Sequence, residues 1–101
     1  MSAFEHQIEW DPAKAAANLI KHGVTFETAA TVLLDPLAST IPDVVHSTTE
    51  QRWVTVGRAQ NDWLLVVIHT WLDLGEGAAS VRIISARRAT RAESQDYEED
   101  I

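Results

Sequence analysis

Residues 52–88 contain three apolar segments separated by two short turn-forming segments, and few folds accommodate this pattern. The apolar segments are about Arg52–Ala59, Trp63–Leu72 and Val81–Arg88, and they are joined by Gln60-Asn61 and Asp73–Ala79. Connections this short join antiparallel strands, because parallel strands need a crossover of a dozen or more residues. The middle segment is apolar on both faces, which is typical of a central strand. We therefore predict an antiparallel sheet.

The first part of the chain predicts a strand followed by a helical hairpin. Glu5–Trp10 is a candidate edge strand, and Asp11-Pro12 is a favoured start for a helix. Gly23 stands where a left-handed residue would end that helix. Thr25 is a candidate N-cap for a second helix, which Asp35-Pro36 would stop.

Two further elements complete the predicted domain. Residues 37–50 form a predicted loop with a short strand near Leu37–Ile41, which makes a sheet of three to four strands. Thr90 and Glu93 match a capping box, so a last helix should run from there to about Glu98. The order of elements predicts an α+β fold in which residues 1–101 form one domain.

Composition excludes several classes of protein and site. The chain has no cysteine, no apolar run near the roughly 20 residues of a membrane span, and no signal-like N-terminus, so we expect a cytoplasmic protein without disulfides or membrane contact. The four histidines, at positions 6, 22, 46 and 69, show no short ligand spacing. We therefore expect no metal site and no cofactor.

Charge is distributed unevenly along the chain. The formal net charge is −7, but residues 93–101 hold five acids and no base, which leaves 10 acids against 8 bases over residues 1–92, a net of −2. Six of the eight bases are arginines, all between Arg52 and Arg91. This stretch is either a solvated surface or an anion-binding surface with an acidic segment beside it.

The turn at Gln60-Asn61 determines which side chains share a face of the sheet. A two-residue turn places Arg58 opposite Trp63 and Arg52 opposite His69. Strand side chains alternate between faces, so these four side chains share one face, which we predict to be the solvent side. A shift of one residue in register would exchange the two faces.

The second hairpin determines which face of the sheet Arg82 and Arg87 occupy. If it is symmetric about residue 76, His69 lies opposite Ile83 and Leu65 lies opposite Arg87, which adds Arg87 to the predicted solvent face. Arg82 is five residues from Arg87, so a regular strand puts the two on opposite faces. Only a bulge would bring them together.

Several motifs follow one another in a specific order along the chain. They are Trp10-Asp11-Pro12-x-Lys14, Asn18, Lys21-His22-Gly23-Val24-x-Phe26, Asp35-Pro36, Arg52-Trp53, Gly57, Val66-Val67-x-His69-Thr70, Arg82-Ile83-Ile84-Ser85-Ala86-Arg87 and Tyr97. In this order they resemble the BrnT family of toxins from type II toxin–antitoxin systems. The resemblance implies a RelE-like fold, a ribonuclease that inhibits translation, and a BrnA-like antitoxin with a ribbon-helix-helix part. It also implies that operator DNA is met only through the antitoxin.

Metal-independent cleavage of RNA needs a base, an acid and cations around the phosphate. Histidine suits proton transfer and arginine suits phosphate binding, so the candidate catalytic residues are His69, Arg58, Arg87 and Arg82. The candidate RNA-binding residues are Arg52, Lys14, Lys21 and Trp63, the last because an aromatic ring stacks on a base.

Each candidate also has a structural alternative. His69 could be a hydrogen-bonded core residue, Arg87 could pair with acids of the last helix, and Lys14 and Lys21 could be ordinary surface residues. No role is assigned to His46. The alternative function is a non-catalytic antitoxin-binding module or co-repressor subunit with the same fold, which the acidic balance favours.

Overall fold

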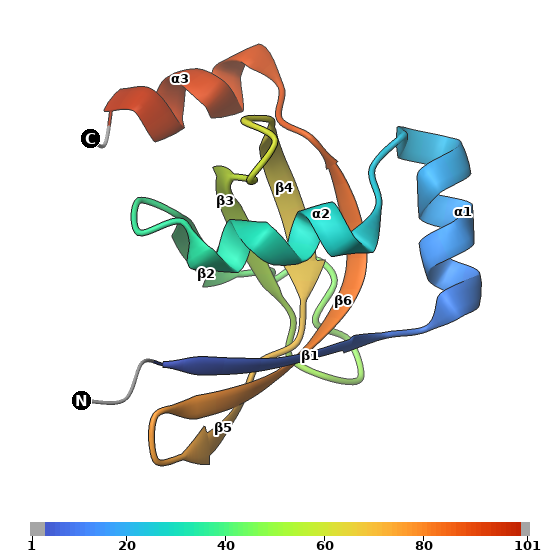
Figure 1. Cartoon of the computed structure of the whole chain (residues 1–101), viewed down its shortest axis with the longest axis vertical. Coiled ribbons are helices and arrows are strands. Elements are labelled where there is room, and N and C mark those ends of the chain that lie inside the picture. Colours follow the sequence, from blue (N-terminus) through green and yellow to red (C-terminus); the bar gives the residue numbers. More distant parts are fainter. Residues whose placement is uncertain (1–3, 100–101) are drawn as a thin grey trace.

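The computed structural model describes residues 4–99 and shows a mixed α+β fold (Figure 1). The strands are β1 (Glu5–Trp10), β2 (Ser39–Pro42), β3 (Trp53–Arg58), β4 (Leu64–His69), β5 (Leu72–Gly75) and β6 (Ala78–Arg88). The helices are α1 (Pro12–His22), α2 (Phe26–Ala30), the 3₁₀ turn η1 (Thr31–Leu34) and α3 (Arg91–Glu99). Within residues 4–99 the strands form one six-stranded sheet in the order β1-β6-β4-β3-β2, with β5 also beside β6.

The sheet is larger than the three to four antiparallel strands predicted. The long strand β6 extends beyond β4, and its first half pairs with β1 on one side and β5 on the other. The β1–β6 pair is parallel, which the long stretch of chain between the two strands allows. The predicted strand Trp63–Leu72 is interrupted at Thr70-Trp71, after which β5 forms.

The predicted caps of the first two helices are confirmed. The Asp11 carboxylate accepts a hydrogen bond from the Ala13 backbone N–H at 2.8 Å, and Gly23 ends α1 with a φ of 70°. The Thr25 hydroxyl accepts from the Thr28 N–H at 3.1 Å and caps α2. The second helix differs from the prediction in tightening to a 3₁₀ turn after Ala30.

One face of the sheet forms the core. Helix α2 crosses this face (Figure 1), and Phe26 at its start is fully buried against Leu65, Val67 and Ile83. The 3₁₀ turn η1 approaches β3 closely at Gly57, where a Cβ atom would come within 2.8 Å of the Val32 side chain. Only glycine therefore allows this approach.

Asn18 is the buried polar residue that ties α1 to the sheet. Its amide nitrogen donates to the carbonyl oxygens of Val24 and Ala86, both at 2.9 Å, and its side-chain oxygen accepts from the Ala86 N–H at 3.1 Å. Asn18 is only 6% exposed, so water cannot reach its amide group, and these bonds supply the partners that the group needs. These bonds help to set the orientation of α1 relative to β6.

The β3–β4 turn is one residue longer than predicted. The Ala59 N–H donates to the Trp63 carbonyl at 2.8 Å, which leaves a three-residue loop that ends at Asp62. Asp62 has a φ of 69°, the left-handed conformation that commonly ends a loop of this length. As a result Trp53, and not Arg52, lies opposite His69.

The predicted pair of Arg58 and Trp63 is wrong for the same reason. Arg58 lies opposite Leu64. A slip of one residue moves each side chain of a strand to the other face. The side chains of β3 and β4 that were predicted to share a face therefore lie on opposite faces of the sheet.

Across residues 4–99 no helix is long and apolar enough to cross a membrane.

Candidate functional site

The register between β4 and β6 changes at Ile84. His69 lies opposite Ile83, as predicted. Ile84 then has no partner on β4, and beyond it Leu65 pairs one residue later than predicted, with Arg88. An extra residue of this kind is a β-bulge, which re-aims the side chains that follow it.

This bulge places Arg82 and Arg87 on the same face of the sheet. Arg82 adjoins the buried Ile83 and points away from the core, and Arg87 lies opposite Val66 on that same side. We call this side the outer face; its residues are Val54, Val56, Arg58, Leu64, Val66, Ile68, Arg82, Ser85 and Arg87. Arg82 and Arg87 are roughly 15 Å apart along the strand at about 3.3 Å per residue.

The prediction that His69 faces solvent is wrong. Its side chain is 0% exposed and lies on the core side with Leu65 and Val67. Both faces of β4 are apolar, so alternation along the strand could not indicate which face the helices would cover. The imidazole and the arginines Arg82 and Arg87 are on opposite sides of the sheet.

Both ring nitrogens of His69 are occupied by protein groups. Nδ1 lies 2.8 Å from the Thr70 carbonyl oxygen, which can only accept, so Nδ1 carries the proton. Burial lowers the pKa of His69, although its hydrogen bond to Thr70 acts in the opposite direction, so the ring is neutral. Nε2 therefore accepts from the Thr55 hydroxyl at 2.6 Å, and that hydroxyl is 2.7 Å from the hydroxyl of Thr40.

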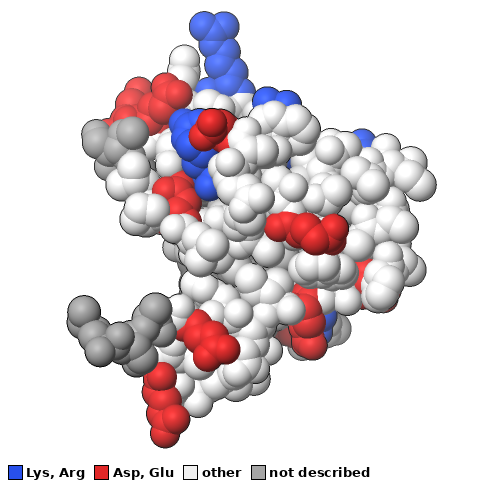
Figure 2. Space-filling view, in the orientation of Figure 1, with Lys and Arg blue, Asp and Glu red and all other residues white. Residues whose placement is uncertain are grey.

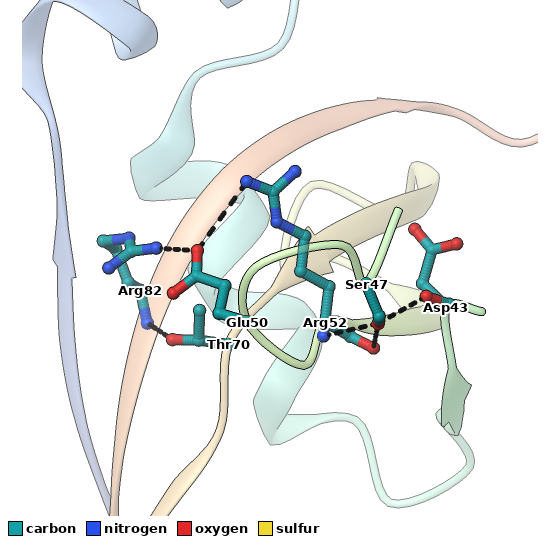
Figure 3. Close-up of polar contacts among 6 residues, drawn as sticks. All are labelled: Asp43, Ser47, Glu50, Arg52, Thr70 and Arg82. Carbon is teal, nitrogen blue, oxygen red and sulfur yellow. Dashed lines mark hydrogen bonds and ion pairs between the residues drawn. The ribbon is translucent and has the colours of Figure 1, made fainter. Parts of the chain in front are cut away.

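Two arginines converge on one carboxylate oxygen at one end of the outer face (Figure 3). Glu50 Oε1 pairs with an Nη2 atom of Arg82 and lies 3.7 Å from the Nη2 atom of Arg52. Arg82 is anchored to Thr70, whose hydroxyl accepts its backbone N–H at 3.0 Å. We call Arg52, Arg82 and Glu50 the arginine cluster.

The arginine cluster has the features of an anion site. The Arg82 and Glu50 side chains are 40% and 37% exposed, and ion pairs this exposed to water contribute little to stability. Within residues 4–99, the Nε of Arg52 is buried without a hydrogen-bond partner. Arginine also matches the geometry of phosphate oxygens. A phosphate oxygen could therefore replace the carboxylate oxygen of Glu50.

Arg87 forms a two-pronged ion pair at the other end of the outer face. Its Nη1 and Nη2 atoms lie 2.8 and 2.9 Å from the two carboxylate oxygens of Glu93. Glu93 also accepts from the Thr90 N–H at 2.8 Å, which confirms the predicted capping box at the start of α3. The structure therefore shows the predicted alternative, in which Arg87 pairs with an acid of the last helix.

The Arg87–Glu93 pair predicts a specific dependence of stability on pH. The hydrogen bonds from Arg87 lower the pKa of Glu93 from 4.5 to about 2. A lowered pKa in the folded state stabilises the fold above pH 4.5, and this contribution is lost as the pH falls toward 2.

The wild-type protein should therefore be more stable than Glu93→Gln at pH 6, by about 1 kcal/mol or less because the pair is partly exposed. Urea unfolding across pH 6 to 2 measures this difference, which should shrink between pH 4.5 and 2. A difference that stays constant over this range would contradict the assignment.

Arg58 and Trp63 lie at the β3–β4 hairpin, and both are engaged with neighbouring groups. The Arg58 guanidinium donates to the Asp62 carbonyl at 2.9 Å and lies 5.7 Å from the centre of the Tyr97 ring. Arg88 covers one face of the Trp63 ring at 4.3 Å. Trp63 remains 36% exposed, so part of its ring is open to a stacking partner.

The lysines lie apart from the arginine cluster. Lys14 and Lys21 are exposed on α1, whose Ala15 packs against the core on the other side of the sheet. In the view of Figure 2, most basic side chains gather at the end of the molecule that carries α3, beside the acidic side chains of that helix. The structure therefore does not gather all eight predicted residues into one surface.

Sequence reasoning missed one polar pair next to the arginine cluster. In the loop between β2 and β3, Nδ1 of His46 lies 2.7 Å from a carboxylate oxygen of Asp43. The only sequence signal is an aspartate after a proline with a histidine three residues later, which is typical of a turn. Over residues 4–99 no group of three or more His, Cys, Asp or Glu side chains could hold a metal ion.

Comparison with known proteins identifies the family. A family model described as the ribonuclease toxin BrnT of type II toxin–antitoxin systems matches residues 10–93. The fold is also similar to the crystal structure of the Brucella abortus ribonuclease toxin BrnT, with 27% sequence identity and a TM-score of 0.57 over 86% of this chain and 99% of that one. No curated protein matches the chain. The chain therefore belongs to the BrnT family of ribonuclease toxins of type II toxin–antitoxin systems.

Proposed function

We propose that this protein is a metal-independent endoribonuclease that binds RNA across the outer face and inhibits translation in the cytoplasm. The observation that supports this proposal is the arginine cluster, in which Arg52 and Arg82 approach one oxyanion. The negative charge on a phosphate grows as the 2′-hydroxyl attacks it, so guanidinium groups placed around it stabilise the transition state. We also propose that the fold of this chain is RelE-like.

Two further arginines of the outer face, Arg58 and Arg87, would hold the RNA strand beside the reacting phosphate. Arg87 can exchange Glu93 for a phosphate, since both anions fit its planar fork. Arg58 lies on the hairpin at the same end of the sheet as α3. Trp63 stacks with Arg88, which lies opposite Leu65 on the His69 side of the sheet, so Trp63 would meet only RNA that extends past this end of the sheet. Lys14 and Lys21 would contribute only long-range attraction.

His69 has a structural role in this proposal. Its two nitrogens are bonded to Thr55 and Thr70, so it cannot exchange a proton with RNA without opening the core. Loss of activity in His69→Ala would therefore accompany loss of stability. The proton transfer must come from another group.

We infer that the partner that neutralises the toxin is a ribbon-helix-helix antitoxin and that operator DNA is reached only through it. Membership of the BrnT family supports a cognate antitoxin. The motifs that resemble the BrnT family support the ribbon-helix-helix type of that antitoxin. Co-purification with the product of the adjacent gene, followed by sequence analysis of that partner, tests the inference.

A direct cleavage assay tests the proposed activity. A purified chain in EDTA should cut a ribo-oligonucleotide and leave a 2′,3′-cyclic phosphate and a 5′-hydroxyl, because the 2′-oxygen is the nucleophile. A single 2′-deoxy substitution at the cut site should block that cut. Activity that requires a divalent metal, or cleavage of the 2′-deoxy site, would overturn the proposed chemistry.

The second candidate function is a non-catalytic module that binds the antitoxin. The observation in its favour is that Arg82 and Arg87 already hold the carboxylates of Glu50 and Glu93. Under this alternative the chain binds its antitoxin tightly but does not cut RNA, and its expression alone does not arrest growth. Growth arrest by the chain would exclude the alternative.

A further inference from the structure

The loop between β2 and β3 holds an imidazole in a defined orientation. The Asp43 carboxylate accepts from the His46 ring at 2.7 Å and from the His46 backbone N–H at 3.3 Å. Ser47 closes the loop: its hydroxyl donates to the Asp43 carbonyl at 2.6 Å and accepts the Arg52 N–H at 2.9 Å. The ring is therefore attached to a loop that is itself closed by hydrogen bonds.

The exposure of this pair differs from that of an ordinary surface ion pair. The Asp43 side chain is 8% exposed, whereas the His46 side chain is 61% exposed. Because the carboxylate of Asp43 accepts the proton of Nδ1, the other ring nitrogen of a neutral imidazole carries a lone pair. Nε2 is therefore an acceptor on a side chain that is 61% exposed, which is what a general base needs.

Asp43 lies beside Arg52 of the arginine cluster. The Asp43 N–H donates to the Arg52 carbonyl at 2.8 Å and extends the β2–β3 ladder by one pair, so the two Cα atoms are roughly 5 Å apart. Figure 3 shows the Asp43 carboxylate and the Arg52 guanidinium rising from the same side of this pair. The same loop supplies Glu50, which holds Arg82.

We propose that His46 is the general base of RNA cleavage and that Asp43 is the residue that positions it; this inference rests on the proposed ribonuclease function. The proton of the 2′-hydroxyl passes to Nε2 of His46 while the 2′-oxygen forms a bond to phosphorus. The bond from phosphorus to the 5′-oxygen breaks, and that oxygen takes a proton from water. The products are a 2′,3′-cyclic phosphate and a 5′-hydroxyl, and His46 returns its proton to solvent.

Four variants separate this role from a structural role in the loop. His46→Asn keeps an N–H donor near the position of Nδ1 and so keeps the contact to Asp43, but it removes Nε2. His46→Ala removes the ring entirely and leaves space for free imidazole. Asp43→Asn keeps the shape of the positioning residue without its charge. His22→Asn, on α1, is the matched control outside the site.

The measurements are the single-turnover rate on a ribo-oligonucleotide and the dissociation constant for its uncleavable 2′-deoxy analogue. His46→Asn should slow cleavage by about 10²–10⁴-fold, the usual contribution of a general base, while the dissociation constant changes less than about twofold. Added imidazole should restore part of the rate of His46→Ala. Asp43→Asn should lower the rate less than His46→Asn does and leave RNA binding unchanged. His22→Asn should behave as the wild type.

Several outcomes would overturn the inference, and they differ from failure of the proposed function. If the wild type cuts RNA and His46→Asn cuts it within about threefold of the wild-type rate, the base is another group and the ribonuclease function stands. The inference also fails if His46→Asn loses RNA binding in proportion to its rate, because the ring then only shapes the loop. If the wild type cuts no RNA, the proposed function fails and the inference fails with it.

Discussion

Replacing Arg82 with alanine should lower the single-turnover rate of RNA cleavage by about 10²–10³-fold, the typical cost of removing one group that stabilises developing charge. Arg82 contributes the guanidinium closest to Glu50 Oε1, and its backbone is fixed by Thr70 on a strand inside the sheet. Arg82→Lys should recover only part of the rate, because an ammonium group lacks the planar fork that matches phosphate oxygens.

Two further measurements check that Arg82 acts on RNA. The affinity of the wild type for the uncleavable RNA should fall as salt is added, and the slope of that dependence should be smaller by about 1 in Arg82→Ala, since one phosphate contact is lost. Arg91→Ala is the control, because Arg91 is exposed on α3 and outside the arginine cluster. Full cleavage activity in Arg82→Ala would show that the cluster is structural.

Replacing Asn18 with alanine should lower the free energy of unfolding by about 3 kcal/mol. The substitution removes three hydrogen bonds, and it leaves the Val24 and Ala86 carbonyl oxygens and the Ala86 N–H without their partner in a buried position. Each buried group that loses its partner costs about 1–3 kcal/mol. This is a large fraction of the roughly 5–15 kcal/mol that stabilises a domain.

Asn18→Asp should be at least as unfavourable as Asn18→Ala. It keeps the acceptor for the Ala86 N–H, but it places a negatively charged oxygen against two carbonyl oxygens. Urea unfolding measures both variants. Ile20→Ala is the control on the same helix, since Ile20 is 88% exposed and should change stability by less than about 0.5 kcal/mol. A loss below about 1 kcal/mol in Asn18→Ala would contradict the role of this residue.

Features that depend on neighbouring residues were predictable. The caps at Asp11, Gly23 and Thr25 and the capping box at Glu93 involve groups no more than four residues apart, and each forms as expected. The first strand, Glu5–Trp10, also has the predicted bounds. The motifs that resemble the BrnT family likewise led to the family that the comparisons identify.

The faces of the sheet were not predictable, for two reasons. Asp62 accepts a left-handed conformation that makes the β3–β4 loop one residue longer, and Ile84 forms a bulge that shifts the register of β6. The extra loop residue and the bulge each involve a single residue. Each of them nevertheless moves all the side chains that follow it on its strand to the other face. The longer β3–β4 loop is the reason that His69 was grouped with Arg52 and assigned to solvent, although it lies in the core.

The candidate site was partly predictable for a related reason. The prediction included Arg52 and Arg82, because the residue type itself suggests phosphate binding. It assigned no role to His46, because its orientation depends on the buried carboxylate of Asp43 and on a loop closed against β3. A histidine in a polar loop has no sequence pattern that distinguishes an oriented ring from a free one.

By itself the amino-acid sequence determined where the helices begin, where β1, β3, β4 and β6 form and which side chains carry charge, because these properties depend mainly on each residue and its near neighbours. The tertiary structure alone decided that α2 would cover the His69 side of the sheet and that Arg82 and Arg87 would share the other side. Both outcomes depend on packing between segments far apart in the chain. For a sheet that is apolar on both faces, the burial of either face removes similar apolar area from water, so only the packing of the whole chain selects one.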